Sequence, residues 1–332
     1  MPSLGASIIK HSSLESPLTS YLPYPEINKG EQALTEFGPD ARQISLEKWL
    51  SLQLGQDLIG VSASSDASFR RYFRYTLSDR SLIAMDAPPE TEDCRPFVKV
   101  ASLLAGAGVL VPDVIAEDLD RGFLLLSDFG DDVLLSFLCP DGPKNSLGDH
   151  YYTKAMNALV SIQNIPVDPK YALPPYDVAL LDREMALFPD WLLEKKLGLT
   201  LTEQERSMLT QSFVLLSDSA LSQVQVPVHR DYHARNLMVL EDDSLGVIDF
   251  QDAVFGPVTY DLVSLLRDCY IVWPDAKVEQ WCQQYHSLLF AQGTLTCEWA
   301  QFKAWFDLMG LQRHLKAAGI FARLSLRDGK HA

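Results

Sequence analysis

The sequence predicts an α+β protein of two lobes, a small N-terminal lobe with a mixed sheet and a larger, mainly helical C-terminal lobe. Three observations predict this division. Short β-like runs lie before residue 130, segments with helical spacing dominate after it, and 332 residues are enough for two hydrophobic cores. We expect an arm at residues 1–44, an N-terminal lobe at 45–130 that ends in a hinge, and a C-terminal lobe at 131–332.

The first segment, residues 1–44, is rich in Ser, Pro and Gly, and we expect it to be a flexible arm. Beyond it, runs suited to β-strands lie at residues 69–77, 81–85 and 123–126. They surround a helix expected at residues 97–105. Strands around one helix predict a small α/β lobe.

The C-terminal lobe is expected to be mainly helical because its apolar residues recur at helical spacing. A capping box at residues 202–205 begins one helix. The apolar positions that follow at helical spacing are Leu209, Phe213, Leu216 and Ala220. The spacing recurs at Val258, Leu262, Leu265 and Cys269. Residues 166–175 form a proline-rich connector.

The most informative segment lies between these helices and runs from His229 to Asn236, with Asp249 following eighteen positions after Asp231. Apolar runs at 237–240 and 245–248 flank a polar cluster and predict two strands joined by a tight turn. Such a hairpin brings Asn236 close to Asp249, so both can face one metal site. One amide oxygen and one carboxylate suit Mg²⁺, which takes further ligands from phosphate and water.

This arrangement is the one that phosphoryl-transfer enzymes of the protein-kinase type use, and it predicts a protein-kinase-like fold. There the first Asp accepts or orients the substrate hydroxyl proton, and the Asn and second Asp hold the magnesium ions that bridge the ATP phosphates. We therefore predict Asp231, Asn236 and Asp249 as catalytic residues, with Asn236 and Asp249 as Mg²⁺ ligands. Polar loops of this composition are also ordinary turn chemistry. The joint occurrence of the motif, the hairpin and the second Asp favours catalysis.

The motif residues resemble the aminoglycoside phosphotransferase family of small-molecule kinases. They are His229, Asp231, His233, Asn236, Ile248-Asp249-Phe250, Gly256 and Asp261-Leu262. The longer strings 229–270, 311–316 and 319–324 are similar to the anomeric N-acetylmuramate/N-acetylglucosamine kinases of bacterial cell-wall recycling. The resemblance implies ATP, Mg²⁺ and phosphorylation of the C1 hydroxyl of N-acetylmuramate and of N-acetylglucosamine. The product would feed UDP-amino-sugar synthesis in peptidoglycan recycling. Similar proteins continue beyond residue 330, so a further terminal helix is expected.

The same resemblance implies that His229 and Asp261 support the catalytic loop. An acidic residue in a first helical turn also stabilises the helix through its dipole, and Asp261 can do both. His233 either contacts the acceptor or braces the loop. The triplet Asp128-Phe129-Gly130 is no magnesium element, because it precedes Asp231 by about a hundred residues. Ser127 and Asp128 are instead expected at the hinge, where backbone groups hold adenine, although a simple turn explains them equally well.

The expected phosphate loop departs from the kinase pattern. Residues 62–74 contain no glycine, and Ser64, Ser65, Ser68 and Arg71 are the candidates for contacts with the nucleotide. Met85 stands where kinases have a lysine. Arg70, Arg71 and Lys99 could supply the missing charge, and the sequence does not choose among them. The gap also leaves open a pseudokinase that binds ligands without transferring phosphate.

Candidate acceptor-binding residues follow from the chemistry of sugars, which are held by aromatic faces and polar groups. Besides Asp231 and His233, they are Glu184, Trp191 and Asp252. In a continuous helix over residues 182–196, positions 184, 188 and 191 would share one face. An aromatic there can equally belong to the core. An aminoglycoside kinase remains a rival, because an acidic chain would suit a polycationic substrate.

Composition and charge exclude several classes of partner and location. A net charge of −16 argues against a nucleic-acid partner. No apolar run is long enough to span a membrane, and the first forty residues lack the apolar core of a signal peptide. The five scattered cysteines suit a reducing cytoplasm. We expect a cytoplasmic monomer whose partner is a small amino sugar.

Overall fold

The computed structural model describes residues 40–64, 69–138, 145–166, 172–327 and 329. The chain separates into two units, Met1–Asp40 and Ala41–Ala332, and the fold below is that of the second unit. Its first helix, α1 (Ala41–Leu54), begins within the segment expected to be an arm. The expected Ser65 and Ser68 contacts lie outside the described residues, as do residues 167–171 of the proline-rich connector.

The N-terminal lobe is built on a five-stranded sheet in the order β1-β2-β3-β5-β4, with antiparallel neighbours. The strands are β1 (Val61–Ser64), β2 (Arg71–Thr76), β3 (Ser81–Asp86), β4 (Val114–Asp118) and β5 (Phe123–Ser127). Alternating side chains point to opposite faces. Tyr75, Ala84 and Leu125 pack with Leu46 and Trp49 of α1 on one face.

The opposite face of the sheet belongs to the main core of the molecule. There Met85, Leu124 and Leu126 share one apolar cluster with Phe97 of helix α2 (Arg95–Gly106). The predicted strands 69–77, 81–85 and 123–126 and the predicted helix 97–105 are therefore confirmed, each within a few residues of its bounds.

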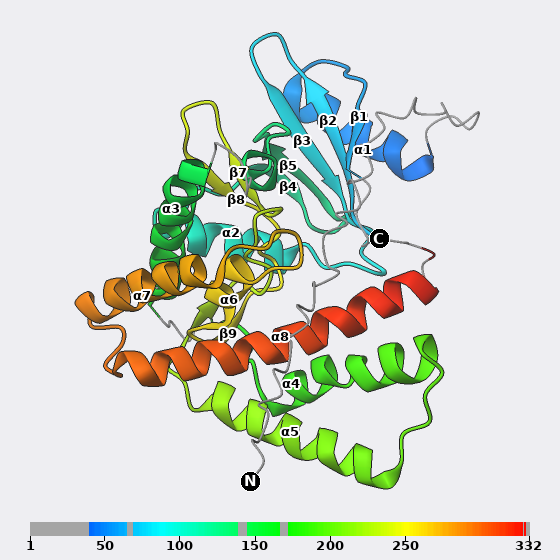
Figure 1. Cartoon of the computed structure of the whole chain (residues 1–332). Coiled ribbons are helices and arrows are strands. Elements are labelled where there is room, and N and C mark those ends of the chain that lie inside the picture. The colour runs from blue at the N-terminus through cyan, green and yellow to red at the C-terminus, as the bar shows by residue number, and fades with distance from the viewer. Residues whose placement is uncertain (1–39, 65–68, 139–144, 167–171, 328, 330–332) are drawn as a thin grey trace, which may run out of the picture. The chain divides into compact units, whose positions relative to one another are not determined.

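The C-terminal lobe is mainly helical, as predicted (Figure 1). Its helices are η1 (Leu134–Phe137), α3 (Asn145–Gln163), α4 (Val178–Met185), the π-helix η3 (Phe188–Lys196), α5 (Glu203–Leu221), α6 (Tyr260–Leu266), α7 (Asp275–Ala291) and α8 (Trp299–Arg327). Two short antiparallel pairs join β6 (Gln225–Val228) to β9 (Val254–Pro257) and β7 (Leu237–Val239) to β8 (Leu245–Val247). Helix α8 packs against α4, η3, α5, α6 and α7.

Two helix predictions have different outcomes. The capping box is confirmed, because the Thr202 side chain accepts from the Glu205 backbone N–H while Glu205 accepts from the Thr202 backbone N–H. The helix expected to reach Cys269 ends at Leu266, so that extension is wrong. Just beyond the end, the Asp268 carboxylate accepts hydrogen bonds from the backbone N–H groups of Tyr270 and Ile271. An Asp that bonds the backbone in this way stabilises a turn instead of a helix.

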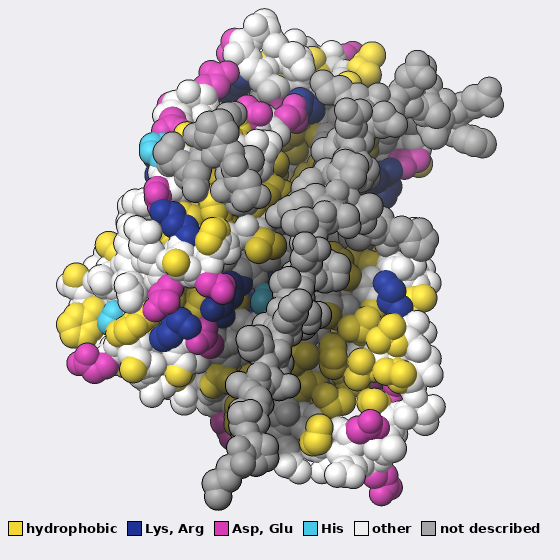
Figure 2. All heavy atoms as spheres, in the orientation of Figure 1, with side chains coloured by type: hydrophobic (Ala, Val, Ile, Leu, Met, Phe, Trp, Pro, Cys, Tyr) yellow, Lys and Arg dark blue, Asp and Glu magenta, His cyan; other side chains and the backbone are white. Residues whose placement is uncertain are grey.

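Hydrophobic side chains gather on one part of the surface of the described residues. Figure 2 shows hydrophobic side chains gathered over α4, α5 and α8, and Leu197, Met208 and Leu215 are among the exposed ones. Among the described residues, no helix is both long enough and apolar enough to cross a membrane. The four described cysteines, Cys94, Cys269, Cys282 and Cys297, are free thiols.

Candidate active site

The predicted hairpin is confirmed, and it places the motif residues side by side. Strand β7 pairs with β8 so that Leu237 lies opposite Val247. The Asn236 side-chain nitrogen lies 3.3 Å from Oδ2 of Asp249 and donates to the backbone oxygen of Asp231 at 2.9 Å. Because its nitrogen faces these acceptors, the amide oxygen of Asn236 is the atom left to meet a cation. The loop, the amide and the carboxylate therefore form one cluster.

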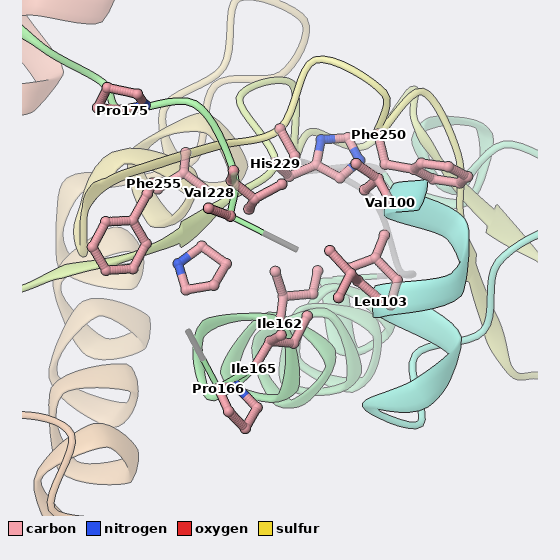
Figure 3. A pocket seen from close by; sticks show the side chains of 15 residues that line it. Val100, Leu103, Ile162, Ile165, Pro166, Pro175, Val228, His229, Phe250 and Phe255 are labelled. Carbon is pink, nitrogen blue, oxygen red and sulfur yellow. The ribbon is translucent and has the colours of Figure 1, made fainter. Parts of the chain in front are cut away.

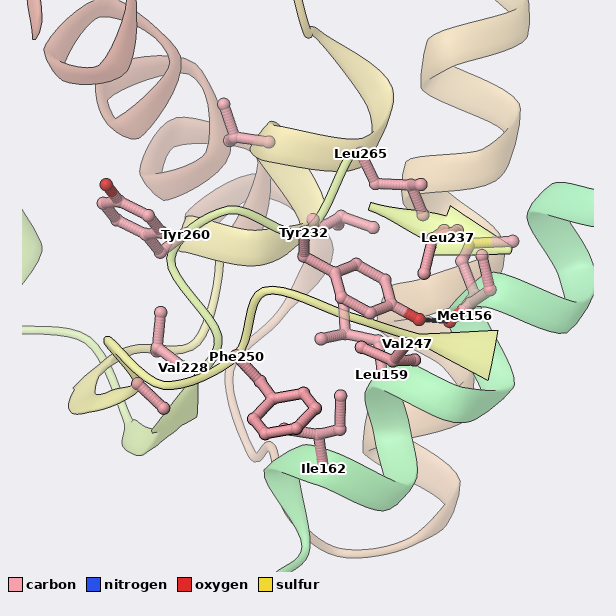
Figure 4. Packing of buried hydrophobic residues seen from close by; sticks show 14 of the residues in the cluster. Met156, Leu159, Ile162, Val228, Tyr232, Leu237, Val247, Phe250, Tyr260 and Leu265 are labelled. Carbon is pink, nitrogen blue, oxygen red and sulfur yellow. Dashed lines mark hydrogen bonds between the residues drawn. The ribbon is translucent and has the colours of Figure 1, made fainter. Parts of the chain in front are cut away.

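The catalytic loop, residues 229–236, is anchored in the main core by Tyr232. Its ring packs among Leu159, Val247 and other apolar residues (Figure 4), and its hydroxyl donates to the backbone oxygen of Ala155 at 2.8 Å. Phe250, directly after Asp249, is also fully buried in this cluster. Both ends of the site thus rest on the same rigid core.

Two site residues adopt a backbone conformation that L-amino acids rarely take. Arg230 has φ 78° and Asp249 has φ 64°. Such residues persist only where the surroundings hold them, and they cluster at functional sites. Asp261 stabilises this conformation at Arg230, because its carboxylate accepts hydrogen bonds from the backbone N–H groups of His229 at 2.6 Å and Arg230 at 3.0 Å. Burial raises the pKa of Asp261 to about 7, against these hydrogen bonds.

Asp231 lies beside two cations from helix α8. Burial alone would raise the pKa of its carboxyl, but the charges of Lys316 and Arg313 hold that pKa below the usual value. Asp231 is therefore ionised at neutral pH, as a group that accepts or orients a hydroxyl proton must be. Arg313 also donates to the backbone oxygen of Arg230 at 3.0 Å, so α8 contacts the loop directly.

The two loop histidines are neutral at neutral pH because burial lowers the pKa of each to about 4. The Nε2 of His229 donates to the Ile248 backbone oxygen at 3.0 Å, and its Nδ1 accepts from the Asp231 backbone N–H at 3.3 Å. This ring joins the catalytic loop to the strand that precedes Asp249. The His233 ring stacks edge-on against Tyr270, with the ring centroids 5.2 Å apart.

The predicted acceptor residues have different surroundings, although Arg230 bonds both the Glu184 carboxylate and the backbone oxygen of Asp252. Glu184 is buried and accepts from Arg230 at 2.7 Å, from Lys316 at 3.0 Å and from the Tyr176 hydroxyl at 2.6 Å, so it serves as a counter-ion within the protein. Trp191 lies under the ammonium of Lys195, 3.6 Å from its ring centroid. Asp252 has an exposed side chain.

The expected common helical face of residues 184, 188 and 191 is wrong. Helix α4 ends at Met185, and Phe188–Lys196 is a π-helix with Pro189 in its first turn. A π-helix has more residues per turn than an α-helix, so spacings of three and four no longer align. Glu184 is accordingly buried while Phe188 and Trp191 are half-buried.

A cavity of about 310 Å³ lies between the lobes and ends at the motif residues. Its apolar walls include Ile83, Leu126, Met238 and Ile248, residues 127–131 form its hinge side, and Asn236 and Asp249 lie at its polar end. An apolar slot with a few polar groups at one end suits a nucleotide. One amide and one carboxylate suit a Mg²⁺ that is shared with phosphates, and the described residues contain no cluster of three or more His, Cys, Asp or Glu that could hold a metal alone.

The hinge is fixed to both lobes. The Asp128 carboxylate pairs with Arg74 of β2 at 2.6 Å, so its side chain is engaged and only its backbone can serve adenine. The Ser127 hydroxyl accepts from the Asp113 backbone N–H at 2.8 Å. A Cβ added at Gly246 would lie 2.5 Å from the Phe129 ring, which shows that this ring packs directly on the catalytic hairpin.

The expected phosphate contacts are only partly described. Ser64 ends strand β1, and Arg71 pairs with the buried carboxylate of Asp86 at 2.5 Å, which Arg42 also contacts. Arg71 is therefore part of an ion cluster at the end of strands β2 and β3, and it does not line the cavity between the lobes. Met85 is buried in the main core, where a charged side chain would be costly.

A second cavity, of about 220 Å³, lies behind the catalytic loop (Figure 3). His229 and Phe250 separate it from the motif carboxylates, and its other walls are almost entirely apolar side chains such as Val100, Leu103 and Ile162. The described walls offer few hydrogen-bond partners, so this cavity suits neither a sugar nor a triphosphate. The cavity between the lobes is the candidate active site.

Sequence reasoning missed Arg313 and Lys316 as site residues. Their spacing of three places both on one face of α8, and that face meets Asp231, Glu184 and Tyr260. The string 311–316 stood out only through its resemblance to other proteins. Nothing local to it indicates which loop the helix will meet.

Comparisons with known proteins agree with this geometry. The pattern of the phosphotransferase enzyme family matches residues 60–299. A Pseudomonas putida protein named N-acetylmuramate/N-acetylglucosamine kinase is 46% identical over 303 residues, covering 88% of this chain and 87% of that protein. A protein of the same name from Pseudomonas aeruginosa is 47% identical over 303 residues with the same coverage.

Solved structures share the fold at low sequence identity. An ethanolamine kinase of Plasmodium vivax has a TM-score of 0.62 at 10% identity and covers 88% of this chain and 86% of its own. An ADP-bound aminoglycoside phosphotransferase has a TM-score of 0.59 at 15% identity and covers 87% of this chain and 92% of its own. These likenesses confirm the two-lobed, kinase-like fold.

Proposed function

The chain belongs to the phosphotransferase enzyme family, and from that premise we propose that it is an ATP-dependent kinase of N-acetylmuramate and N-acetylglucosamine. The acceptor would be the anomeric C1 hydroxyl and the product a sugar 1-phosphate. Two relatives that align with 88% of this chain are named as kinases of these two sugars. The observation that carries the proposal is the cluster of Asp231, Asn236 and Asp249 at the polar end of the cavity between the lobes.

Each residue of the cluster has a role that its surroundings support. Mg·ATP, when bound, supplies the γ-phosphoryl group, and Asn236 and Asp249 would hold the ion. Asp231 would orient the C1 hydroxyl and accept its proton. A carboxylate with a lowered pKa is a weak base, so orientation of the hydroxyl is its larger contribution. His229 and Asp261 would keep the loop in this arrangement.

The charges around Asp231 favour an anionic sugar over a polycationic antibiotic. Arg230 and Lys316 both pair with Glu184, Asp231 is a second carboxylate near these cations, and Arg313 also bonds to the uncharged Ser264 hydroxyl at 2.7 Å. N-acetylmuramate carries a carboxylate that such cations can attract, whereas an aminoglycoside would be repelled. This argues against the rival activity towards aminoglycosides.

Phosphorus NMR tests the proposal directly. The protein would be incubated with Mg·ATP and, in turn, with N-acetylmuramate, N-acetylglucosamine, glucose, choline and kanamycin. We expect a new sugar 1-phosphate resonance with the first two compounds only. A product from kanamycin would support the rival. ATP binding without any product would support the pseudokinase alternative. The Asp231→Asn variant serves as the control, because it should fold and bind nucleotide without forming product.

A further inference from the structure

Arg70 occupies a position between the two lobes that the proposed roles above leave unexplained. It directly precedes strand β2, and its Nε lies 3.4 Å from Oε2 of Glu92. Their side chains are only 12% and 19% exposed. Glu92 lies just before Arg95, the first residue of helix α2. A cation from the sheet is therefore held by an acidic residue at the start of the helix of the same lobe.

The other groups around Arg70 are acidic and include the proposed Mg²⁺ ligand. Burial opposes the charge of the guanidinium, but neighbouring groups raise its pKa above the usual value; they are Tyr72, Glu92, Asp249 and Asp252. Asp249 and Asp252 belong to the C-terminal lobe, whereas Arg70 belongs to the N-terminal lobe. The charges of Asp249 and Asp252 therefore act on Arg70 from the other lobe, although Arg70, like Arg71, is not among the residues that line the cavity.

Three other cations of the N-terminal lobe have defined partners of their own, although Arg74 also lines the cavity between the lobes. Arg71 pairs with Asp86. Arg74 makes five hydrogen bonds, all to Asp128, Gly130 and Asp131 at the hinge. The ammonium of Lys99 donates to the backbone oxygen of Ala172 at 2.9 Å. Of Arg70, Arg71 and Lys99, Arg70 combines a buried pairing with Glu92 and a pKa raised by the charge of Asp249.

We propose that Arg70 binds the α- and β-phosphates of the nucleotide and that Glu92 positions it, so that this pair takes the place of the lysine–glutamate pair of protein kinases. The inference rests on the proposed use of a nucleoside triphosphate. A guanidinium suits the task because its planar donors bind phosphate oxygens in pairs. The acidic surroundings also suit it, because Arg70 and a Mg²⁺ held by Asp249 would offset part of the negative charge of Glu92, Asp252 and the phosphates.

Binding measurements on the variant Arg70→Met separate this role from a structural one. Calorimetric titration with Mg·ADP should show an affinity about tenfold to a hundredfold lower, the usual cost of a lost charge-assisted hydrogen bond. The affinity for adenosine, which has no phosphates, should stay within about twofold of the original value. Arg70→Lys should recover part of the loss, and Glu92→Gln should weaken Mg·ADP binding less than Arg70→Met.

Arg95→Met is the matched control, because it removes the same charge from an exposed side chain that pairs with Asp93. Its Mg·ADP affinity should not change. The proposal is overturned if Arg70→Met binds Mg·ADP normally, or if ADP and adenosine lose affinity equally. If Arg70→Met does not fold, Arg70→Lys decides the matter. The lysine variant keeps the positive charge, so it should bind Mg·ADP better than Glu92→Gln does. If it does not, the charge of Arg70 does not bind the phosphates.

The outcome is also independent of the sugar. If the wild type phosphorylates no sugar yet Arg70→Met loses Mg·ADP affinity selectively, the phosphate role stands and the proposed acceptor is wrong. If the wild type makes the sugar 1-phosphate and Arg70→Met binds Mg·ADP normally, the proposed function stands and the phosphate role is wrong.

Discussion

Replacing Lys316 with methionine should slow the phosphorylation of N-acetylmuramate more than that of N-acetylglucosamine. The ammonium lies 3.0 Å from Glu184 and donates to the Tyr260 hydroxyl at 2.9 Å, and the side chain is 12% exposed. A pair at 3.0 Å is worth roughly 5–6 kcal/mol of gross attraction at an effective dielectric constant of about 20, most of which desolvation offsets. Since Glu184 keeps Arg230 at 2.7 Å, we expect a loss of about 1–3 kcal/mol of folding stability.

The effect on the two sugars then separates the possible roles of Lys316. Both need Asp231, but only N-acetylmuramate carries the lactyl carboxylate. If Lys316 attracts that carboxylate, kcat/KM for N-acetylmuramate should fall about tenfold to a hundredfold more than for N-acetylglucosamine, the worth of one charge-assisted hydrogen bond. Steady-state kinetics with a coupled ADP assay measure the ratio.

Lys303→Met provides the control on the same helix. Lys303 pairs with Asp307 one turn further along α8, so its loss should leave the ratio of the two sugars unchanged. Equal losses for both sugars in Lys316→Met would refute recognition of the carboxylate. Lys316 would then act only by keeping Asp231 ionised.

Four further outcomes follow from the site. Asp231→Asn should lower kcat by about 100-fold or more while calorimetry shows nearly unchanged ATP affinity, and near-normal turnover would remove this residue from the mechanism. Asp249→Ala should raise the Mg²⁺ concentration that gives half-maximal activity, which an unchanged magnesium curve would contradict. Asp261→Asn should lower the free energy of unfolding in urea by about 1–3 kcal/mol, because an amide cannot accept from two backbone N–H groups as a carboxylate does; an unchanged midpoint would argue against this anchor. Burial lowers the pKa of His233 to about 4, so below pH 6.5 the unfolded chain binds a proton that the folded protein does not. The contribution of His233 to stability should therefore fall from pH 7 to 5, and over this range His233→Gln should lose about 1–2 kcal/mol less stability than the original protein; an identical pH dependence in the two proteins would contradict the low pKa.

Elements with a local cause could be predicted from the sequence. The β7–β8 hairpin follows from two apolar runs around a polar turn, and helix α5 follows from its capping box and apolar spacing. Features that depend on distant partners could not. The π-helix η3 and the end of α6 at Leu266 arise from side-chain bonds and packing that apolar periodicity does not record.

Some contacts of the site could likewise be predicted from the local sequence, and others could not. Asp231, Asn236 and Asp249 lie within one hairpin, so their proximity follows from a short stretch of sequence. Arg313 and Lys316 reach the loop only because α8 packs closely beneath it. A Cβ added at Gly319 would lie 2.4 Å from the backbone carbon of Leu187, so this glycine permits the close packing of α8 on the chain between α4 and η3. Such a contact cannot be inferred from spacing along the helix.

The absence of a lysine from strand β3 leaves a pseudokinase open as an alternative. The position of Met85 explains that absence structurally, because its side chain belongs to the core shared with α2 and a charge there would be desolvated. Phosphoryl transfer needs positive charge on both sides of the reacting phosphate, whichever residue supplies it. Asp249 raises the pKa of Arg70 in the N-terminal lobe, and Lys316 and Arg313 of α8 lower the pKa of Asp231. Cations thus flank the motif carboxylates from both lobes, an arrangement that a non-catalytic binding protein has no physical reason to keep.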